Sequence, residues 1–331
     1  MKRLFPTLLG LALAGLLAMP AQAETTLRIT LQLPIKSHLG QNLLAFEEEV
    51  EAATGGEVQV EIYPSAQLYK DKEVPQAVGS GAIEMGTASI TRFAGTIPAV
   101  DIFYVPFMFN NEEMVRKATA PGSPVRAPLD AAILETGTRV LWWQAYGGAI
   151  MLSKDAPLKT PDDVKGKKVR VFGKTLGEFI KAVGGAPVLT SGSEQYVAYQ
   201  RGTVDAGMTG VSGVKSRKLW QVMDHITVTN HADVEFLVLI NEKVWQGLKP
   251  EHREAITAAA RKVESELRDT MTKIEADAFA AAKAEGMGVY TPSDAEIEKW
   301  RAMSAPVIDQ YKANAGELGA KLVAEAEKLR Q

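Results

Sequence analysis

The sequence predicts an α/β protein of two domains that are joined at a hinge. Its first segments alternate between strand and helix patterns, which is the arrangement of a parallel sheet covered by helices. The chain has 331 residues, enough for two hydrophobic cores rather than one. It contains no internal repeat and no low-complexity linker, so we expect strands rather than a flexible tether to connect the domains.

The N-terminus has the pattern of a secretory signal peptide. Lys2 and Arg3 precede an apolar run over residues 8–19, and Ala-Gln-Ala at 21–23 is an A-x-A cleavage site. The apolar run is shorter than the roughly 20 residues that a transmembrane helix needs. We therefore expect export, cleavage after Ala23 and no stable membrane insertion, with an uncleaved anchor as the alternative.

Composition excludes several classes of function. The chain has no cysteine, which rules out disulfide bonds, thiolate nucleophiles and thiolate metal sites. Loss of Lys2 and Arg3 with the signal peptide would change the formal net charge from −3 to −5. A mildly acidic surface argues against nucleic acid and anionic membranes as partners.

The first half of the chain reads as alternating strands and helices. Leu27, Ile29, Leu31 and Leu33 alternate with polar residues and predict the first strand, which an amphipathic helix with a Gly-Gly stop follows. The expected elements are strands at 26–33, 58–62 and 83–88, and helices at about 39–53, 73–79, 111–119 and 125–135. The aromatic run DIFYVPFMF at 101–109 is more typical of buried core at a domain seam than of a ligand-stacking wall.

The second half begins where a long apolar strand at 139–146 enters Gly147-Gly148, which we interpret as a crossing between domains. A second α/β set is expected to have strands near Ile150, Val169 and Val188, a helix at 193–201, and strands at 203–208 and 236–241. Helices follow at 250–283 and 305–329. The first of these exceeds the usual length of a globular helix, so we expect it to run across both domains.

A strand with a single arginine lies in the segment from Lys165 to Gly173, KGKKVRVFG. Arg170 stands between Val169 and Val171, and side chains alternate across a strand, so Arg170 faces the side opposite to the two valines. If that side lines a cleft, the permanently charged, planar guanidinium suits a carboxylate. The alternative is an arginine on an exposed or edge strand, which is the usual position of this residue.

Catalytic and phosphate-binding motifs are missing from the sequence. Gly173-Lys174-Thr175 matches the end of a P-loop, but that motif needs a glycine five residues earlier, and position 168 is lysine. No G-x-S-x-G, H-E-x-x-H or G-x-G-x-x-G pattern occurs, and the four histidines show no i,i+4 pairing. We therefore expect no metal, no cofactor and no catalysis.

Short segments along the exported part of the chain form an ordered pattern. It begins with VEIYPSAQL at 60–68 and KDKE at 70–73, and continues with GAIEM at 81–85, VPF at 105–107 and QAY at 144–146. It is clearest at GKKVRV, 166–171, and extends through Ser193, Glu194, Tyr196, Ala198, Gln200, Gly202, Val204, Asp205, TNH at 229–231, Asn241, Glu242 and Trp245. In this order the segments resemble the DctP-type solute-binding proteins of tripartite ATP-independent periplasmic (TRAP) transporters.

The resemblance implies a bilobal, periplasmic-binding-protein-like fold, with two α/β lobes around a hinged cleft and a long helix spanning both. Lobe I is expected over 24–146 and about 235–274, and lobe II over 147–234 and about 275–331. Such proteins hold an organic acid in the periplasm and deliver it to a small and a large membrane permease subunit. We expect a monomer. The alternatives are an exported α/β enzyme acting on a small acid, and a binding protein that serves a sensor kinase or an ATP-driven importer.

The resemblance also suggests ligand contacts. The arginine that holds the carboxylate in such proteins falls on Arg170, and Phe172 shares its strand face. The other candidates are polar or aromatic residues near the expected cleft: Gln32, Ser89, Thr209, Tyr146 and Phe236. Relatives that bind sialic acid or C4-dicarboxylates often have a basic residue where this chain has Ala149. A cleft with one arginine is poorly suited to two carboxylates, so we expect a monocarboxylate, with a C4-dicarboxylate-like acid as the alternative.

Overall fold

The computed structural model describes residues 25–330. A mixed sheet runs through the molecule. The strands are β1 (Thr25–Thr30), β2 (Val58–Tyr63), β3 (Met85–Ser89), β4 (Thr138–Ser153), β5 (Lys168–Val171), β6 (Ala186–Leu189), β7 (Ala206–Gly210), β8 (His225–Thr227), β9 (Asp233–Asn241) and β10 (Gly288–Tyr290). Their order is β2-β1-β3-β9-β4-β7-β5-β6, and β8 joins β10 to β4. Strand β1 is parallel to β2 and β3, whereas β9 is antiparallel to β3 and β4. The α/β class and the β-α-β start are confirmed.

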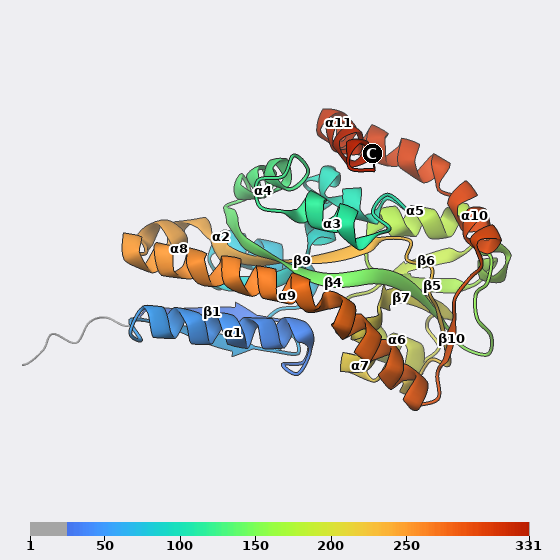
Figure 1. The fold of residues 1–331 in the computed structure, drawn as a ribbon, viewed down its shortest axis with the longest axis horizontal. Coiled ribbons are helices and arrows are strands. Elements are labelled where there is room, and N and C mark those ends of the chain that lie inside the picture. Colours follow the sequence, from blue (N-terminus) through green and yellow to red (C-terminus); the bar gives the residue numbers. More distant parts are fainter. Residues whose placement is uncertain (1–24, 331) are drawn as a thin grey trace, which may run out of the picture.

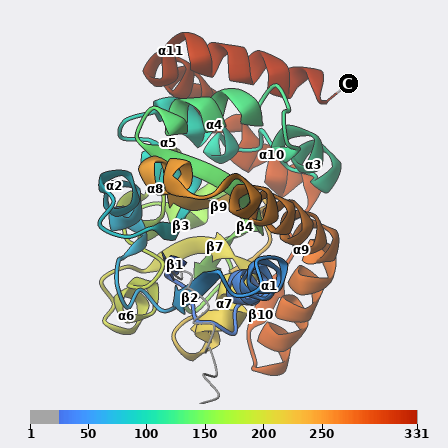
Figure 2. The same cartoon turned by 90° about the vertical axis from the view of Figure 1, so that its left-hand side faces the viewer.

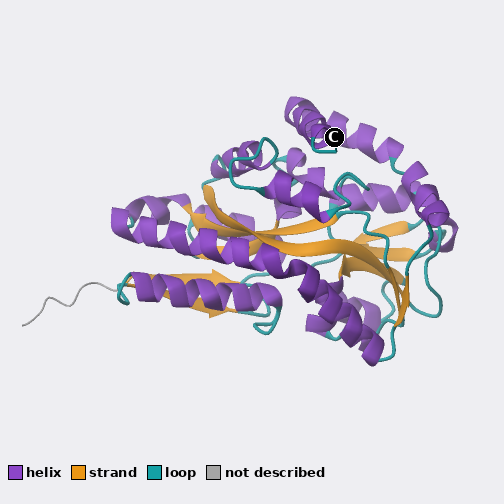
Figure 3. Ribbon diagram, in the orientation of Figure 1, coloured by secondary structure: helices purple, strands orange, loops and turns teal. Residues whose placement is uncertain are grey.

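Helices surround this sheet (Figure 3). They are α1 (His38–Ala53), α2 (Val74–Ser80), α3 (Glu112–Thr119), α4 (Arg126–Leu134), α5 (Lys174–Ala182), α6 (Gln195–Gln200), α7 (Val211–Arg217), α8 (Glu242–Gly247), α9 (Pro250–Ala284), α10 (Asp294–Ala302) and α11 (Ala305–Lys328). Helices α1 and α11 lie on opposite sides of the molecule (Figures 1 and 2). Within residues 25–330, no helix is both long and apolar enough to span a membrane. The predicted signal peptide and its cleavage site lie outside the described residues.

Strand β4 connects the two halves of the sheet. Its residues 138–148 pair with β9, and its residues 149–153 pair with β7 and β8. The prediction of two strands, at 139–146 and near Ile150, was therefore wrong, because one 16-residue strand runs through both. The register shifts between Ala145 and Gly147, and Gly147 has a φ of +99°, a conformation that favours glycine. The expected crossing is thus a bulge inside a continuous strand.

The long helix α9 lies along much of the molecule's length (Figure 1). Pro250 occupies its first position, where a missing N–H is tolerated, and the helix extends over 35 residues, as the sequence predicted to within one residue. It packs against α1 and β4, and towards its C-terminus against α7 and β10. Asn42 Nδ2 on α1 donates to the Val263 carbonyl at 2.7 Å, which ties the first half of α9 to that helix.

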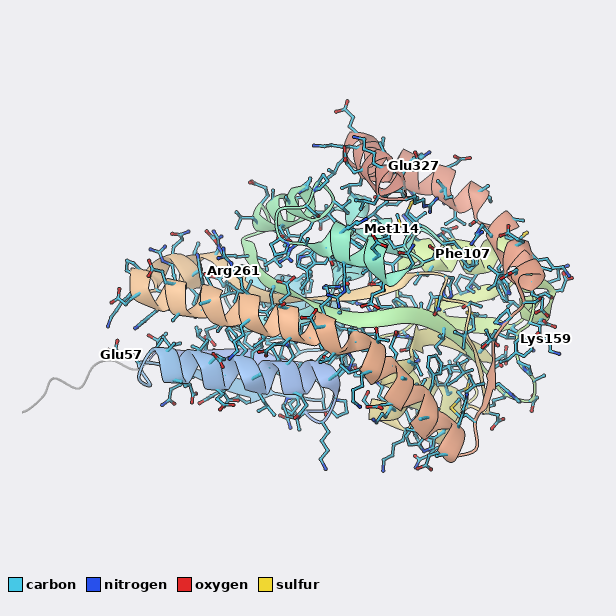
Figure 4. All side chains as sticks on the ribbon, viewed as in Figure 1. Glu57, Phe107, Met114, Lys159, Arg261 and Glu327 are labelled. Carbon is cyan, nitrogen blue, oxygen red and sulfur yellow. The ribbon has the colours of Figure 1, made fainter. Side chains whose placement is uncertain are left out.

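The aromatic run at 101–109 is buried throughout, as the core interpretation predicted. Phe103 stacks on Phe109 with 4.6 Å between ring centroids, and Phe107 meets the edge of Phe179 on α5 at 6.2 Å. In Figure 4, Phe107 and Met114 lie in the interior, whereas exposed Lys159 and Glu327 lie at the edge of the molecule. This core fixes the sheet that carries the candidate site.

Candidate functional site

A cavity lies where several strands end. The lining includes Gln32 just after β1, Ser89 at the end of β3, Phe172 just after β5 and Thr209 in β7. Ligands of open α/β sheets bind outside the carboxyl ends of the strands, because loops and helix N-termini meet there. This topology therefore points to a small ligand.

Seven of the eight residues suggested by the sequence line this cavity: Gln32, Ser89, Tyr146, Arg170, Phe172, Thr209 and Phe236. Ala149 does not line it. That residue is fully buried in the hydrophobic core, and its backbone pairs with Gly210 on β7 and donates to the Ala232 carbonyl at 2.8 Å. A methyl group packed into the core cannot take the place of a ligand-facing cation.

Arg170 is held in place by main-chain carbonyls on both of its flanks. Its Nε and Nη2 donate to the Thr190 carbonyl at 3.1 and 2.8 Å, and its Nη1 donates to the Met208 carbonyl at 2.7 Å. These bonds use three of the five N–H groups and leave one on each Nη. Only 3% of the residue is exposed. The guanidinium is therefore fixed before any ligand arrives.

The charge of Arg170 has no acidic partner among residues 25–330, where no carboxylate lies within 4.0 Å of its guanidinium nitrogens. Burial, with a smaller contribution from the charges of Arg217 and Arg92, lowers the pKa of Arg170 to about 10, although Tyr199 and Tyr146 oppose the shift. The group remains charged at neutral pH. A buried, unpaired cation of this kind is an anion-binding feature.

The cavity contains three arginines rather than the single one that the sequence suggested. Arg92 forms an ion pair through Nε with Asp71, whose other oxygen accepts the Ser89 N–H at 2.9 Å. Arg217 donates from Nη1 to the Tyr146 hydroxyl at 3.0 Å and, within the described chain, has no carboxylate partner. One lining aspartate therefore neutralises one of three lining arginines. The argument for a monocarboxylate from a one-arginine cleft was wrong.

Aromatic rings form the wall beside these cations. The Arg170 guanidinium lies 5.3 Å from the Phe172 ring centroid, as expected for two residues on one strand face, and Tyr104 meets Phe172 edge-on at 5.4 Å. Tyr146 and Phe236 are 5.2 Å apart, centroid to centroid. A wall of this kind excludes water and strengthens charge interactions in the cavity.

Two contacts join segments that are far apart in the sequence. Lys70 and Glu194, the neighbours of the lining residues Asp71 and Gln195, form an ion pair at 2.8 Å. Thr175 Oγ1 on α5 donates to Asp101 at 2.8 Å. Thr175 belongs to the Gly-Lys-Thr sequence that was dismissed as a P-loop, and its hydroxyl serves this contact instead.

A second cavity lies between β4, α3 and α9. Its lining carries Glu112, Arg116, Asp233, Arg268 and Glu275. Both arginines there are already paired, Arg116 with Glu112 and Asp269, and Arg268 with Glu235. Nowhere in residues 25–330 do three or more His, Cys, Asp or Glu side chains form a group that could hold a metal ion. The cavity around Arg170 is therefore the one whose lining has arginines without a carboxylate partner in the described chain.

The sequence analysis missed Arg92 and Arg217 as cavity residues. Arg217 stands in the last turn of α7 beside Lys215 and Lys218, where a basic cluster is typical of a solvated helix end. Arg92 lies in the short 3₁₀ helix η2 (Ile90–Phe93), which has no recognisable pattern. Asp71 was quoted only as part of a four-residue segment. No local signal distinguishes these residues from surface charges.

A family profile and a known protein both match most of this chain. The profile of the family described as bacterial extracellular solute-binding protein, family 7, matches residues 31–314. The chain is 30% identical over 330 residues to the C4-dicarboxylate-binding periplasmic protein DctP of Rhodobacter capsulatus, which covers 98% of this chain and 97% of that protein.

Solved structures agree with the fold. A TRAP periplasmic solute-binding protein of a Polaromonas species, bound to D-erythronate, is 26% identical with a TM-score of 0.86, and the match covers 92% of this chain and 98% of that one. A TRAP solute-binding protein of Shewanella oneidensis with bound succinate has a TM-score of 0.88 at 23% identity, covering 93% and 100%. The latter likeness shows the bilobal fold.

Proposed function

The chain belongs to the bacterial extracellular solute-binding protein family 7, and from that premise we propose that it is the periplasmic binding subunit of a TRAP transporter. In this proposal it captures an organic acid in the cavity around Arg170 and delivers it to the small and large permease subunits in the membrane. It acts as a receptor and not as an enzyme. The observation that carries the proposal is a buried, oriented arginine without an acidic partner.

Binding follows from the geometry of Arg170. A carboxylate has two oxygens, and the guanidinium keeps one unused N–H on each Nη, so the two groups can form a bidentate pair. Because carbonyls of Thr190 and Met208 already fix the guanidinium, little conformational entropy is lost when the ligand arrives. Gln32, Ser89 and Thr209 would bind the remaining polar groups of the acid, and the rings of Phe172, Tyr146 and Phe236 would cover its carbon skeleton.

Closure of two lobes around the acid completes the proposal. The division expected from the sequence places 24–146 and about 235–274 in one lobe and the remainder in the other. In that division the Lys70–Glu194 and Asp101–Thr175 contacts join opposite lobes. Opening requires both contacts to break, and closing dehydrates the carboxylate pair, which strengthens it.

A thermal-shift panel tests the proposal. The mature protein is heated with a set of organic acids that includes mono- and dicarboxylates, sugar acids and aromatic acids. A ligand at 100 times its dissociation constant stabilises the folded state by about 2.7 kcal/mol, which raises the melting temperature by several degrees. A panel in which no acid raises the melting temperature would contradict the proposal. Neighbouring genes for a small and a large integral membrane protein would support the TRAP partner, whereas a neighbouring ATPase gene would oppose it.

A further inference from the structure

The second cavity, between β4, α3 and α9, is named the hinge cavity because it lies behind the strands that line the acid cavity around Arg170. On β4, Ala145 lines the hinge cavity, whereas the next residue, Tyr146, lines the acid cavity. On β9, Asp233 and Val234 divide in the same way. Side chains alternate across a strand, so the two cavities lie on opposite faces of the same two strands.

Two acids of the hinge cavity have no basic partner. The lining carries two arginines and three acids: Arg116, Arg268, Glu112, Asp233 and Glu275. Both arginines already form ion pairs with other carboxylates, whereas Asp233 and Glu275 form none within residues 25–330. The acid cavity has an excess of positive charge, and the hinge cavity has an excess of negative charge.

These two acids are withdrawn from water. Burial raises the pKa of Glu275, although the Gly148 N–H, which Glu275 accepts at 3.0 Å, opposes the shift. Burial, with the charge of Glu235 beside it, raises the pKa of Asp233 well above its usual range, although Arg268 opposes the shift. A nearby cation favours the charged form of a carboxyl, so a cationic ligand would supply what both groups lack.

Three oxygen acceptors meet around Gly148. Glu275 accepts its N–H, Asp233 is its partner in the β4–β9 ladder, and a Cβ at Gly148 would lie 2.7 Å from Asn230 Oδ1. A Cβ at Gly147 would collide with Glu275 Oε1, so both glycines are needed for these oxygens to come close to the strand. A primary ammonium has three N–H donors and no acceptor, which matches this set.

The remainder of the hinge cavity has an apolar side. Phe109, Val115 and Met271 line it and are buried. Small-molecule sites combine such apolar walls with a few polar groups that fix the ligand's orientation. A short alkyl stem on the ammonium would pack against these three side chains.

The position of the hinge cavity gives its occupant a mechanical effect. In the lobe division expected from the sequence, Val115 and Met271 belong to lobe I, and Asn230 and Asp233 to lobe II. Because the two cavities lie on opposite faces of the hinge strands, opening the lobes at the acid cavity moves them together at the hinge cavity. A ligand that fills the hinge cavity therefore opposes opening and favours the closed lobes.

We propose that the hinge cavity is a second binding site, for a small primary amine in its ammonium form with a short apolar stem, and that its occupant favours the closed lobes. Asn230, Asp233 and Glu275 accept the N–H groups. The site itself does not depend on the proposed function, whereas its effect on acid affinity rests on it.

Calorimetric titration with n-butylammonium tests the site, with butan-1-ol as a probe of the same stem without the charge. Wild-type protein should bind n-butylammonium at least tenfold more tightly than butan-1-ol. Asp233→Asn and Glu275→Gln keep the shape of each side chain and should each weaken n-butylammonium at least tenfold. Glu113→Gln removes an exposed acid of α3 outside the lining and should leave the affinity unchanged.

A variant at the rim of the hinge cavity checks the site without changing a buried residue. Thr272 lines the cavity and is exposed. Thr272→Lys should prevent binding of n-butylammonium, because the new side chain places its own ammonium there. If Asp233→Asn and Glu275→Gln unfold, Thr272→Lys decides the question alone.

Titration of the acid that stabilises the protein most, with and without saturating n-butylammonium, tests the mechanical effect. Acid affinity should rise at least threefold with the amine bound, and amine affinity should rise by the same factor with the acid bound. An acid affinity that stays the same or falls would overturn this effect. Equal binding of the two probes, no binding of n-butylammonium, or undiminished binding in the lining variants would overturn the site. If no acid of any class binds, the proposed function fails, and the amine titration still decides the site.

Discussion

Two groups of buried arginines in this protein differ in how their charge is balanced. In the paired cluster, defined as Arg126, Glu235, Glu264 and Arg268, each arginine faces a buried carboxylate. Arg268 donates to both Glu235 oxygens at 2.9 and 3.0 Å, and Arg126 donates to both oxygens of Glu264. In the cavity, Arg170 is 3% exposed and has only carbonyl partners.

The difference separates structural arginines from binding arginines. A buried ion without a counter-ion costs several kcal/mol, and a protein that needs only stability fills such a position with a pair or with apolar residues. The paired cluster follows that rule. The cavity breaks it, and the missing negative charge is the part that a ligand supplies. Burial alone would not have distinguished the two groups, but the presence or absence of a carboxylate partner does.

The largest expected effect comes from breaking the paired cluster. Glu235→Ala leaves Arg268 buried and without its carboxylate, so the free energy of unfolding should fall by about 3–5 kcal/mol. Urea unfolding measures this change. Glu113→Ala, which removes an exposed carboxylate paired with Lys117, should leave the free energy of unfolding almost unchanged. A loss below 1 kcal/mol for Glu235→Ala would show that pairing does not define this cluster.

Urea unfolding of a cavity variant compares Arg170 with the paired cluster. Arg170→Met leaves the Met208 and Thr190 carbonyls without a donor, which costs about 1–3 kcal/mol. It also removes a desolvated charge, which offsets part of that cost. Ligand-free Arg170→Met should therefore lose less stability than Glu235→Ala. If the two variants lose equal stability in urea, the distinction between the groups is not supported.

Unfolding at different pH values tests Glu275, an acid that lines the same cavity as Arg268. Glu275 accepts the Gly148 N–H at 3.0 Å, and burial raises the pKa of its carboxyl above the usual 4.5 despite that bond. With the folded pKa above the unfolded one, the folded state holds the proton more tightly, so stability falls as pH rises from about 4.5 through the folded pKa. Glu275→Gln cannot lose a proton and should be more stable than wild type at pH 7 but not at pH 4. Urea unfolding at both pH values checks this, and a pH-independent difference would contradict it.

The smallest expected effect concerns the exposed ion pair of Lys70 and Glu194. Lys70→Ala should weaken acid binding only slightly, because both side chains of the pair are exposed, and the loss should shrink at high salt. Glu194→Ala should give the same loss, and the double variant no additional loss. Lys299→Ala, which removes an exposed charge from α10, serves as the control. If calorimetry shows that the affinity losses of the two single variants add up in the double variant, the two residues do not act as a pair.

Sequence patterns were sufficient for the fold class and for much of the cavity. The period-2 alternation around Arg170 and the 35-residue length of α9 depend on local residue order, which the sequence contains in full. The continuity of β4 did not follow from the sequence, because Gly147 and Gly148 are also typical of a break between strands. The position of Arg217 depends on its hydrogen bond to Tyr146, 71 residues away. Such long-range contacts have no local pattern, so the charge count of the cavity required the structure.

Calorimetric titration of Arg170→Met tests the central claim most directly. The ligand is the acid that stabilises wild-type protein most, and Arg201→Met, on an exposed residue, controls for net charge. The account predicts that Arg170→Met weakens binding by about 2–5 kcal/mol, or at least thirtyfold, while Arg201→Met binds as wild type does. An Arg170→Met affinity within threefold of wild type would contradict the claim that the unpaired buried arginine is the carboxylate site.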